Sequence, residues 1–278
     1  GLEVEVQPSF GTFEASRAPN ELDFSSIDSE LGEVLVPGSD SRPPITVSGG
    51  ALALRARTTE GRVVRLDLNF GFEGLESGEA VYGPGRLRLR VRGIDLQAFS
   101  RLRGALEALQ RSPVAADPAA RSEAETRLLH EWIPVLAASS PVLELERFEL
   151  EGPNGKLEAT GRLEVKGGDP AAFEDEAAAM RAIRARGQVL VPMPLLHAWV
   201  EAFLFGVVAA EAGGLPPEEL AGMTSFLREM TVARLLGEGL LQAAGDRYRM
   251  EMRFEEGVFI VNGKPLGPEG LGALMGGV

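Results

Sequence analysis

The sequence predicts an α+β fold in which one large, twisted antiparallel sheet packs against several helices. The first observation is the alternation of apolar and polar residues in 51–57, 64–72 and 87–92, which is typical of half-buried strands. The second is the pair of turn sequences between these segments, Glu60-Gly61 and Gly83-Pro84-Gly85, which favour antiparallel pairing. The third is a series of helix-start signals that interrupt the later strands.

Alternation resumes later in the chain and predicts further strands. They are expected at Leu143–Leu150, Lys156–Lys166, Arg186–Pro192, Gly239–Ala244, Tyr248–Phe254 and Val258–Asn262. The chain opens on the same pattern, at Gly1–Val6. Gly155 and Gly257 provide the residue that a turn position with positive φ favours, so each predicts a hairpin.

Five helices are expected, and their starts are marked by aspartate or proline. They run from Asp95 to about Arg111, from Asp117-Pro118 to about Ala137, over Ala171–Ala185 after Asp169-Pro170, from Pro194 to Ala210, and from Pro216-Pro217 to about Gly237. In the last helix, Glu218 and Glu219 lie favourably against the positive end of the helix dipole.

Two nine-residue stretches resemble each other and predict an internal repeat. Val91–Phe99 and Val165–Phe173 share valine, glycine, aspartate, alanine and phenylalanine at five of nine positions. Each stretch ends a strand and opens a helix through an aspartate cap. We therefore expect a β-β-α packing unit repeated near 62–111 and 143–185.

Composition bounds the class of protein. The 278 residues are 44% hydrophobic, enough to bury a sizeable core, and we expect a single domain over 1–266 with a flexible tail over 267–278. The 41 acidic against 28 basic residues give a net charge of −13, which makes nucleic acid an unexpected partner. No cysteine is present, which excludes disulfides and thiolate metal sites.

No motif in the chain specifies a chemistry. His130 and Glu131 begin like a zinc-protease helix, but Pro134 stands where the second ligand belongs. No Gly-x-Ser-x-Gly elbow is present, and Gly257–Lys264 has one residue too many for a phosphate loop. We therefore assign no catalytic residue, no cofactor and no metal site, and expect a protein that is not an enzyme.

Two weaker side-chain patterns remain as alternatives. His197 and Glu201 stand four apart on one helix face, where they could share a hydrogen bond or chelate weakly; a histidine at the rim of an apolar helix is the favoured reading. A hydrolase would need two carboxylates near one substrate, from the set Glu144, Glu146, Glu149, Glu151 and Glu158. These glutamates occupy the polar positions of amphipathic strands, where solvated charge is expected.

Two charged ladders predict cross-strand ion pairs. Arg86, Arg88, Arg90 and Arg92 alternate along one strand, and Glu144, Glu146 and Glu149 follow another. Pairing between the ladders is expected to contribute roughly 0.2–1 kcal/mol per pair.

The segment Val81–Leu89, followed by Gly93-Ile94-Asp95-Leu96, resembles the YdgA family of bacterial proteins. The closing hairpin Tyr248–Leu266 resembles it too, and Asn262-Gly263-Lys264 is its most specific element. The resemblance spans roughly Leu66–Leu266. It implies a periplasmic domain tethered to the inner membrane by one amino-terminal helix, which is missing from a chain that opens abruptly on a strand pattern. The family has no established activity, so the resemblance implies no catalytic residue.

Leu157–Val165 is also similar to strand pairs in AsmA-like envelope proteins, which shelter lipid chains in a curved sheet. We therefore expect the chain to bind a lipid or another amphiphile along an apolar sheet face. The alternative is an envelope scaffold that associates with itself or with another protein through the same surface. The residues expected to form this surface are Leu196, Trp199, Phe203 and Val207.

Overall fold

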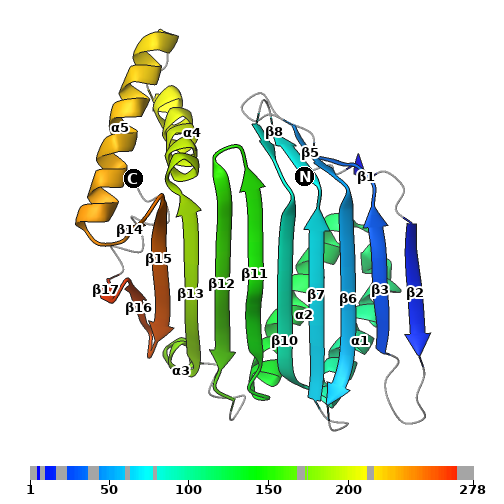
Figure 1. Cartoon of the computed structure of the whole chain (residues 1–278). Helices are drawn as coiled ribbons and strands as arrows, with labels where there is room; N and C mark the ends of the chain where they lie inside the picture. The colour runs from blue at the N-terminus through cyan, green and yellow to red at the C-terminus, as the bar shows by residue number, and fades with distance from the viewer. Residues whose placement is uncertain are drawn as a thin grey trace.

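The computed structural model describes residues 5–6, 10–16, 24–36, 44–59, 63–77, 80–167, 173, 175–211 and 216–267. Within these ranges the chain forms two antiparallel sheets and five α-helices, which confirms the predicted α+β class (Figure 1). Of the strand expected at Gly1–Val6, only Glu5–Val6 (β1) is described. The expected tail lies outside the described residues after Gly267.

The larger sheet confirms the predicted antiparallel architecture. Its spatial order is β17-β16-β15-β13-β12-β11-β10-β7-β6-β3-β2, with β14 paired to β15. The strands are β2 (Phe10–Ser16), β3 (Phe24–Leu31), β6 (Gly50–Thr59), β7 (Val63–Phe72), β10 (Gly85–Asp95), β11 (Val142–Gly152), β12 (Gly155–Val165), β13 (Ile183–Pro192), β14 (Gln242–Ala244), β15 (Arg247–Glu255), β16 (Val258–Val261) and β17 (Lys264–Leu266).

A second, smaller sheet was not expected from the sequence. It has the order β1-β4-β5-β8-β9, formed with β4 (Val34–Val36), β5 (Ile45–Ser48), β8 (Gly74–Ser77) and β9 (Ala80–Tyr82). These strands have two to four residues each, too few for alternation to be recognised. Two of them, β8 and β9, lie in the chain between β7 and β10, which nevertheless pair side by side in the larger sheet.

Four of the five expected helices form where their start signals stand. They are α1 (Leu96–Gln110), α2 (Pro118–Ala137), α4 (Met193–Glu211) and α5 (Pro217–Gly237). The Asp95 carboxylate accepts a hydrogen bond from the backbone N–H of Ala98 at 2.8 Å, and Asp117 accepts one from Ala119 at 2.9 Å. Both aspartates are therefore N-caps, as predicted. None of these helices, within the described ranges, is long and apolar enough to cross a membrane.

The remaining helix is shorter than expected. Helix α3 spans only Glu176–Ala182 and is capped by Asp175, whereas the sequence predicted a helix over Ala171–Ala185. The prediction was wrong at its carboxyl end because Ile183 begins β13, which pairs with both β12 and β15. Two ladders of backbone hydrogen bonds outweigh the helical preference of an alanine-rich segment. Asp169 lies outside the described residues, so the β-β-α repeat stays a prediction.

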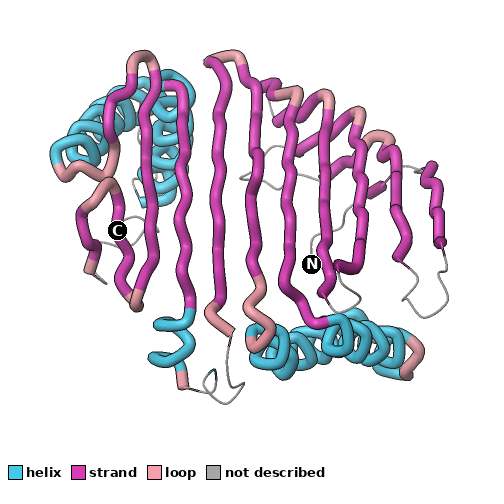
Figure 2. Tube along the Cα trace, turned by 60° about the horizontal axis from the view of Figure 1, so that its bottom comes forward, coloured by secondary structure: helices cyan, strands magenta, loops and turns pink. Residues whose placement is uncertain are grey.

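Helices cover the two ends of one sheet face. Figure 2 shows α1 and α2 at one end of the strands and α4 and α5 at the other. Beneath α4 and α5 lies the main buried cluster, made of Leu157, Val191, Leu195, Val232, Leu241 and Tyr248. At the opposite end, Val64 and Ile94 of the sheet are buried, as are Ala98 and Leu102 of α1.

The closing hairpin fastens the carboxyl end of α5 to the sheet. The side-chain Nδ2 of Asn262 donates hydrogen bonds to the backbone carbonyl oxygens of Gly239 and Leu240, each at 3.0 Å. The side-chain Oδ1 of Asn262 accepts a hydrogen bond from the backbone N–H of Glu251 at 2.8 Å. Lys264 Nζ donates to the Glu238 carbonyl at 2.9 Å. Gly239, with φ of 72°, ends the helix, so the strand expected at Gly239–Ala244 is confined to β14.

Candidate functional site, an apolar sheet face between two helix pairs

One face of the larger sheet is apolar across seven neighbouring strands. The strand register aligns side chains of this face into transverse rows, one residue from each strand. The first row consists of Leu52, Phe70, Leu87, Phe148, Ala159, Val189 and Met250. The next consists of Leu54, Leu68, Leu89, Leu145, Gly161, Gly187 and Met252. We call these two rows together the apolar face.

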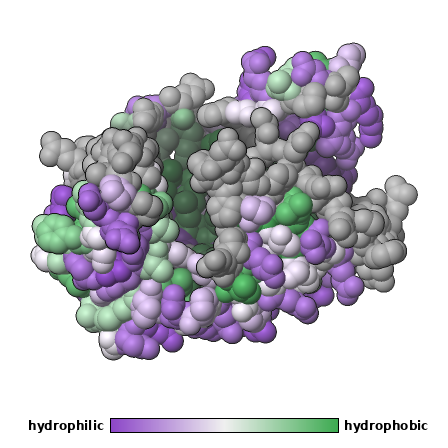
Figure 3. Space-filling view, turned by 90° about the horizontal axis from the view of Figure 1, so that it is seen from above, coloured by the Kyte–Doolittle hydropathy of each residue, from purple (hydrophilic) through white to green (hydrophobic). Residues whose placement is uncertain are grey.

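The helices leave this apolar face partly uncovered. Every residue of both rows is only half-buried, although the rows cross the middle of a twelve-stranded sheet. Phe148, Val189 and Met250 of the first row border the main buried cluster and pack against it. By contrast, Leu157, Val191 and Tyr248, which lie against α4 and α5, are no more than 7% exposed. In the adjacent row, the paired residues Leu143 and Leu163 are 38% and 37% exposed. Seen from above, the molecule is hollowed, and hydrophobic residues are visible deep in the hollow (Figure 3).

Two glycines create a depression at the centre of the apolar face. Gly161 of β12 and Gly187 of β13 are direct partners in the register, between Leu145 and Met252. A Cβ at Gly161 would meet no atom closer than 3.5 Å, so the backbone packing does not require a glycine there. A Cβ at Gly187 would lie 3.3 Å from the backbone oxygen of Thr160, so glycine fits more easily than other residues at that position. Because neither residue has a side chain, the pair leaves room above the sheet.

The structure separates the four residues predicted to form the binding surface. Trp199 and Phe203 are 37% and 56% exposed and lie one turn apart on α4. Leu196 instead packs against the main buried cluster, and Val207 is half-buried. Only two of the four thus present a free apolar surface.

Helix α5 adds exposed apolar residues that were not singled out from the sequence. Met223, Phe226 and Met230 are 37%, 64% and 57% exposed. Their spacing of three and four residues places them on one side of the helix, and this spacing was the signal available in the sequence. Together with Trp199 and Phe203 they make the α4–α5 pair strongly apolar.

His197 and Glu201 do not pair with each other. The His197 Nε2 lies 3.1 Å from the Tyr248 hydroxyl, with the two rings stacked at 5.9 Å between centroids. The Glu201 carboxylate instead pairs with Arg228 of α5. Each side chain therefore joins α4 to a different neighbour. Among the described residues, no group of three histidine, aspartate or glutamate side chains is suited to hold a metal ion.

The opposite face of the sheet carries charge, and the predicted ladders do pair across it. Arg92 contacts Glu144 at 3.0 Å, Arg88 contacts Glu146 at 3.8 Å, and Arg90 contacts Glu146 as well. These pairs join β10 to β11, as the alternation in the two strands predicted. Exposed ion pairs of this kind contribute modestly to stability.

Further along this charged face, carboxylates are neutralised by more than one cation. Lys156 Nζ lies 2.9 Å from Glu149 and 3.1 Å from Glu158, and Arg247 lies 2.7 Å from Glu158. Hydrogen bonds from Lys156 hold the pKa of both glutamates below the usual value, and Arg247 lowers the pKa of Glu158 further. The arrangement is that of an ion-paired surface, in which the neighbouring cations favour the charged form of both carboxylates.

These ion pairs predict a loss of stability in acid. A carboxyl group whose pKa is lower in the folded than in the unfolded state stabilises the fold above its unfolded pKa. That contribution disappears as the pH falls through the folded pKa, below the ordinary glutamate value. We expect the free energy of unfolding, measured with urea, to decrease from about pH 5 to about pH 3. In the Lys156→Met variant the decrease should be smaller; an identical pH profile would show that Lys156 is not its cause.

Comparison with known proteins identifies a family but no activity. No curated protein and no solved structure matches the sequence. Residues 21–269 match a family described as "Bacterial protein of unknown function (DUF945)". The match includes every strand and helix from β3 to β17, and thus both the apolar face and the charged face. The chain therefore belongs to this bacterial family of unknown function.

Proposed function

We propose that this chain is a non-enzymatic envelope domain that binds the acyl chain of a lipid, or a similar amphiphile, along the apolar face. The observation that carries the proposal is the incomplete cover of two apolar rows across seven central strands. A contiguous exposed apolar area of this kind marks a ligand or partner surface in soluble proteins. Burial of an acyl chain would gain about 0.8 kcal/mol per methylene group.

The compartment of this domain is part of the same proposal. The resemblance of Val81–Leu89 and Tyr248–Leu266 to the YdgA family supports a periplasmic location and a tether to the inner membrane. A lipid ligand fits that setting because the domain would lie beside a bilayer. The central depression at Gly161 and Gly187 supports a ligand that lies across the strands, because it gives the ligand space in an otherwise continuous layer of side chains.

The test introduces one charge on the apolar face. Leu145→Lys places an ammonium group beside Gly161, in the middle of the apolar face, where an acyl chain would have to desolvate it. Native mass spectrometry of purified protein, incubated with extracted bacterial lipids, should show bound lipid for the wild type and much less for this variant. Ala51→Lys, at an exposed position of β6 on the charged face, is the matched control and should retain lipid. Absence of lipid on the wild type, or equal loss in both variants, would contradict the proposal.

The second candidate is a self-associating scaffold, which the exposed aromatic residues of α4 and α5 favour. Phe203 and Phe226 are more than half exposed, and large exposed aromatics are typical of protein interfaces. Light scattering should then show a mass that rises with concentration, and the Phe203→Ser/Phe226→Ser variant should stay monomeric. A wild type that is monomeric at every concentration would contradict this candidate.

A further inference from the structure

A transverse row of charges on the charged face changes its pattern at β13. From β6 to β12 the row alternates in sign: Arg55, Asp67, Arg90, Glu144, Arg162. The next two positions continue it with arginines, Arg186 of β13 and Arg253 of β15. Neighbouring strands are about 4.8 Å apart, so three guanidinium groups lie on adjacent strands of one row. Like charges placed directly opposite each other destabilise a sheet.

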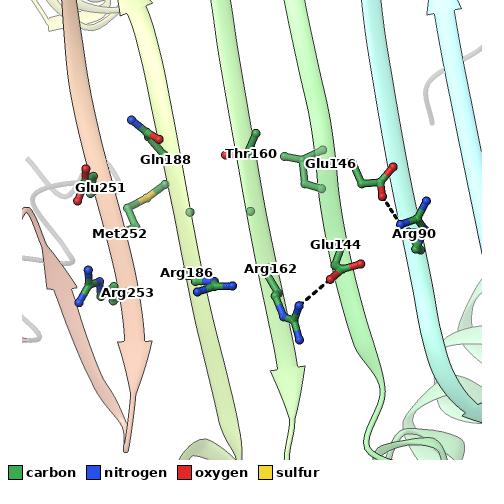
Figure 4. A pocket seen from close by; sticks show the side chains of 13 residues that line it. Arg90, Glu144, Glu146, Thr160, Arg162, Arg186, Gln188, Glu251, Met252 and Arg253 are labelled. Atoms are coloured by element: carbon green, nitrogen blue, oxygen red, sulfur yellow. Dashed lines mark hydrogen bonds and ion pairs between the residues drawn. The ribbon is translucent and has the colours of Figure 1, made fainter. Parts of the chain in front are cut away.

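The three arginines differ in their partners. Arg162 lies 2.8 Å from Glu144 and also pairs with Glu164 of its own strand (Figure 4). Within the described part of the chain, no carboxylate lies within ion-pair distance of Arg186 or Arg253. Both side chains are exposed to solvent. The two adjacent arginines thus form a local excess of positive charge in a protein with a net charge of −13.

These arginines line a groove that a small ligand can enter. The groove has a volume of about 630 Å³, and its lining includes Arg162, Arg186 and Arg253 together with Thr160 and Gln188. The Gln188 amide and the Thr160 hydroxyl supply hydrogen-bond donors beside the guanidinium groups. Three carboxylates also line the groove. Glu144 is ion-paired with Arg162 and Glu146 with Arg90, whereas Glu251 lies two residues from Arg253 on the same strand.

We propose that Arg186 and Arg253, with Gln188 beside them, bind a phosphate group. A guanidinium group binds phosphate or carboxylate through two parallel N–H donors. A carboxylate has two oxygens in one plane, which one arginine engages, whereas a tetrahedral phosphate has oxygens for two arginines on neighbouring strands at once. The site lies on the opposite side of the sheet from the apolar face, so it stands independently of the proposed lipid-binding function.

The first experiment uses inorganic phosphate as the probe, with isothermal titration at constant ionic strength because exposed charges are screened by salt. The Arg186→Gln/Arg253→Gln variant should bind phosphate at least about tenfold more weakly than the wild type, because both charge-assisted contacts are lost. Glu251→Gln should bind it more tightly, since a repelling carboxylate is removed. Arg86→Gln, which removes an exposed arginine of the same face outside the groove, is the control and should bind as the wild type does. Circular dichroism checks that each variant is folded.

The second experiment asks where the phosphate comes from. Vesicles of phosphatidylcholine with and without phosphatidic acid are sedimented with the wild type and the double variant. Sedimentation that requires both phosphatidic acid and the two arginines identifies a lipid headgroup, whereas phosphate binding without sedimentation identifies a soluble phosphate compound. The site is wrong if the wild type does not bind inorganic phosphate, or if the double variant binds it equally well. Leu89→Lys, which places a charge on the apolar face at a position that does not line the groove, should leave phosphate binding unchanged and so separates this result from the test of the apolar face.

Discussion

Replacing Leu195 by alanine is expected to lower the free energy of unfolding by about 2–5 kcal/mol. Leu195 is 1% exposed and lies in the first turn of α4, directly after β13. Its side chain belongs to the cluster that joins α4 and α5 to Leu157, Val191 and Tyr248 of the sheet. Removing three carbon atoms there loses apolar burial and leaves a cavity that rigid strand backbones cannot close.

Urea denaturation followed by circular dichroism measures this change. Leu236→Ala is the matched control, because Leu236 is the same residue type on α5 but 36% exposed. Replacing Leu236 by alanine should lower the free energy of unfolding by less than about 1 kcal/mol. Equal losses for the two variants would mean that the cluster beneath α4 and α5 is not the main core of this end of the sheet.

The Asn262→Ala substitution is expected to cost about 2–4 kcal/mol, since it removes three hydrogen bonds at once. The carbonyl groups of Gly239 and Leu240 and the backbone N–H of Glu251 would all lose their partner. Asn262 also has φ of 48°, a left-handed conformation that asparagine tolerates better than alanine does. Both effects act in the same direction.

The readout is again urea denaturation, combined with hydrogen exchange of the last turn of α5, where protection should fall most. Asn154→Ala, in the exposed turn between β11 and β12, is the control and should change stability little. Lys264→Met should cost only about 0.3–1 kcal/mol, because one exposed charge at the carboxyl end of a helix is lost. If Asn262→Ala were no worse than Asn154→Ala, the hairpin would not be what fastens α5.

Much of the fold could be predicted because its signals are local. Alternation placed the long strands, and the side chains of Asp95 and Asp117 marked α1 and α2. The end of α3 could not be predicted in this way. Ile183 becomes the first residue of β13 through pairing with strands far away in the chain, which a local preference does not contain.

The candidate sites depended still more on non-local information. Trp199 and Phe203 were found because they share a helix face, but Leu196 on the same helix is covered by the sheet. Gly161 and Gly187 are 26 residues apart in the sequence, and only the strand register brings them together to form one depression. The same holds for Arg186 and Arg253, whose adjacency follows from the pairing of β13 with β15. Strand register depends on the whole sheet, so the alternation of apolar and polar residues within single strands could not predict it.

The position of Pro265 limits how copies of this protein can join. In the described part of the chain, β17 is the last strand at its end of the larger sheet; it is only three residues long and holds this proline at its centre. Proline has no backbone N–H, so a further strand laid along β17 would find an interrupted row of donors. Edge-to-edge growth into a continuous ribbon is therefore disfavoured at this side, and assembly would have to proceed through side chains rather than through main-chain pairing.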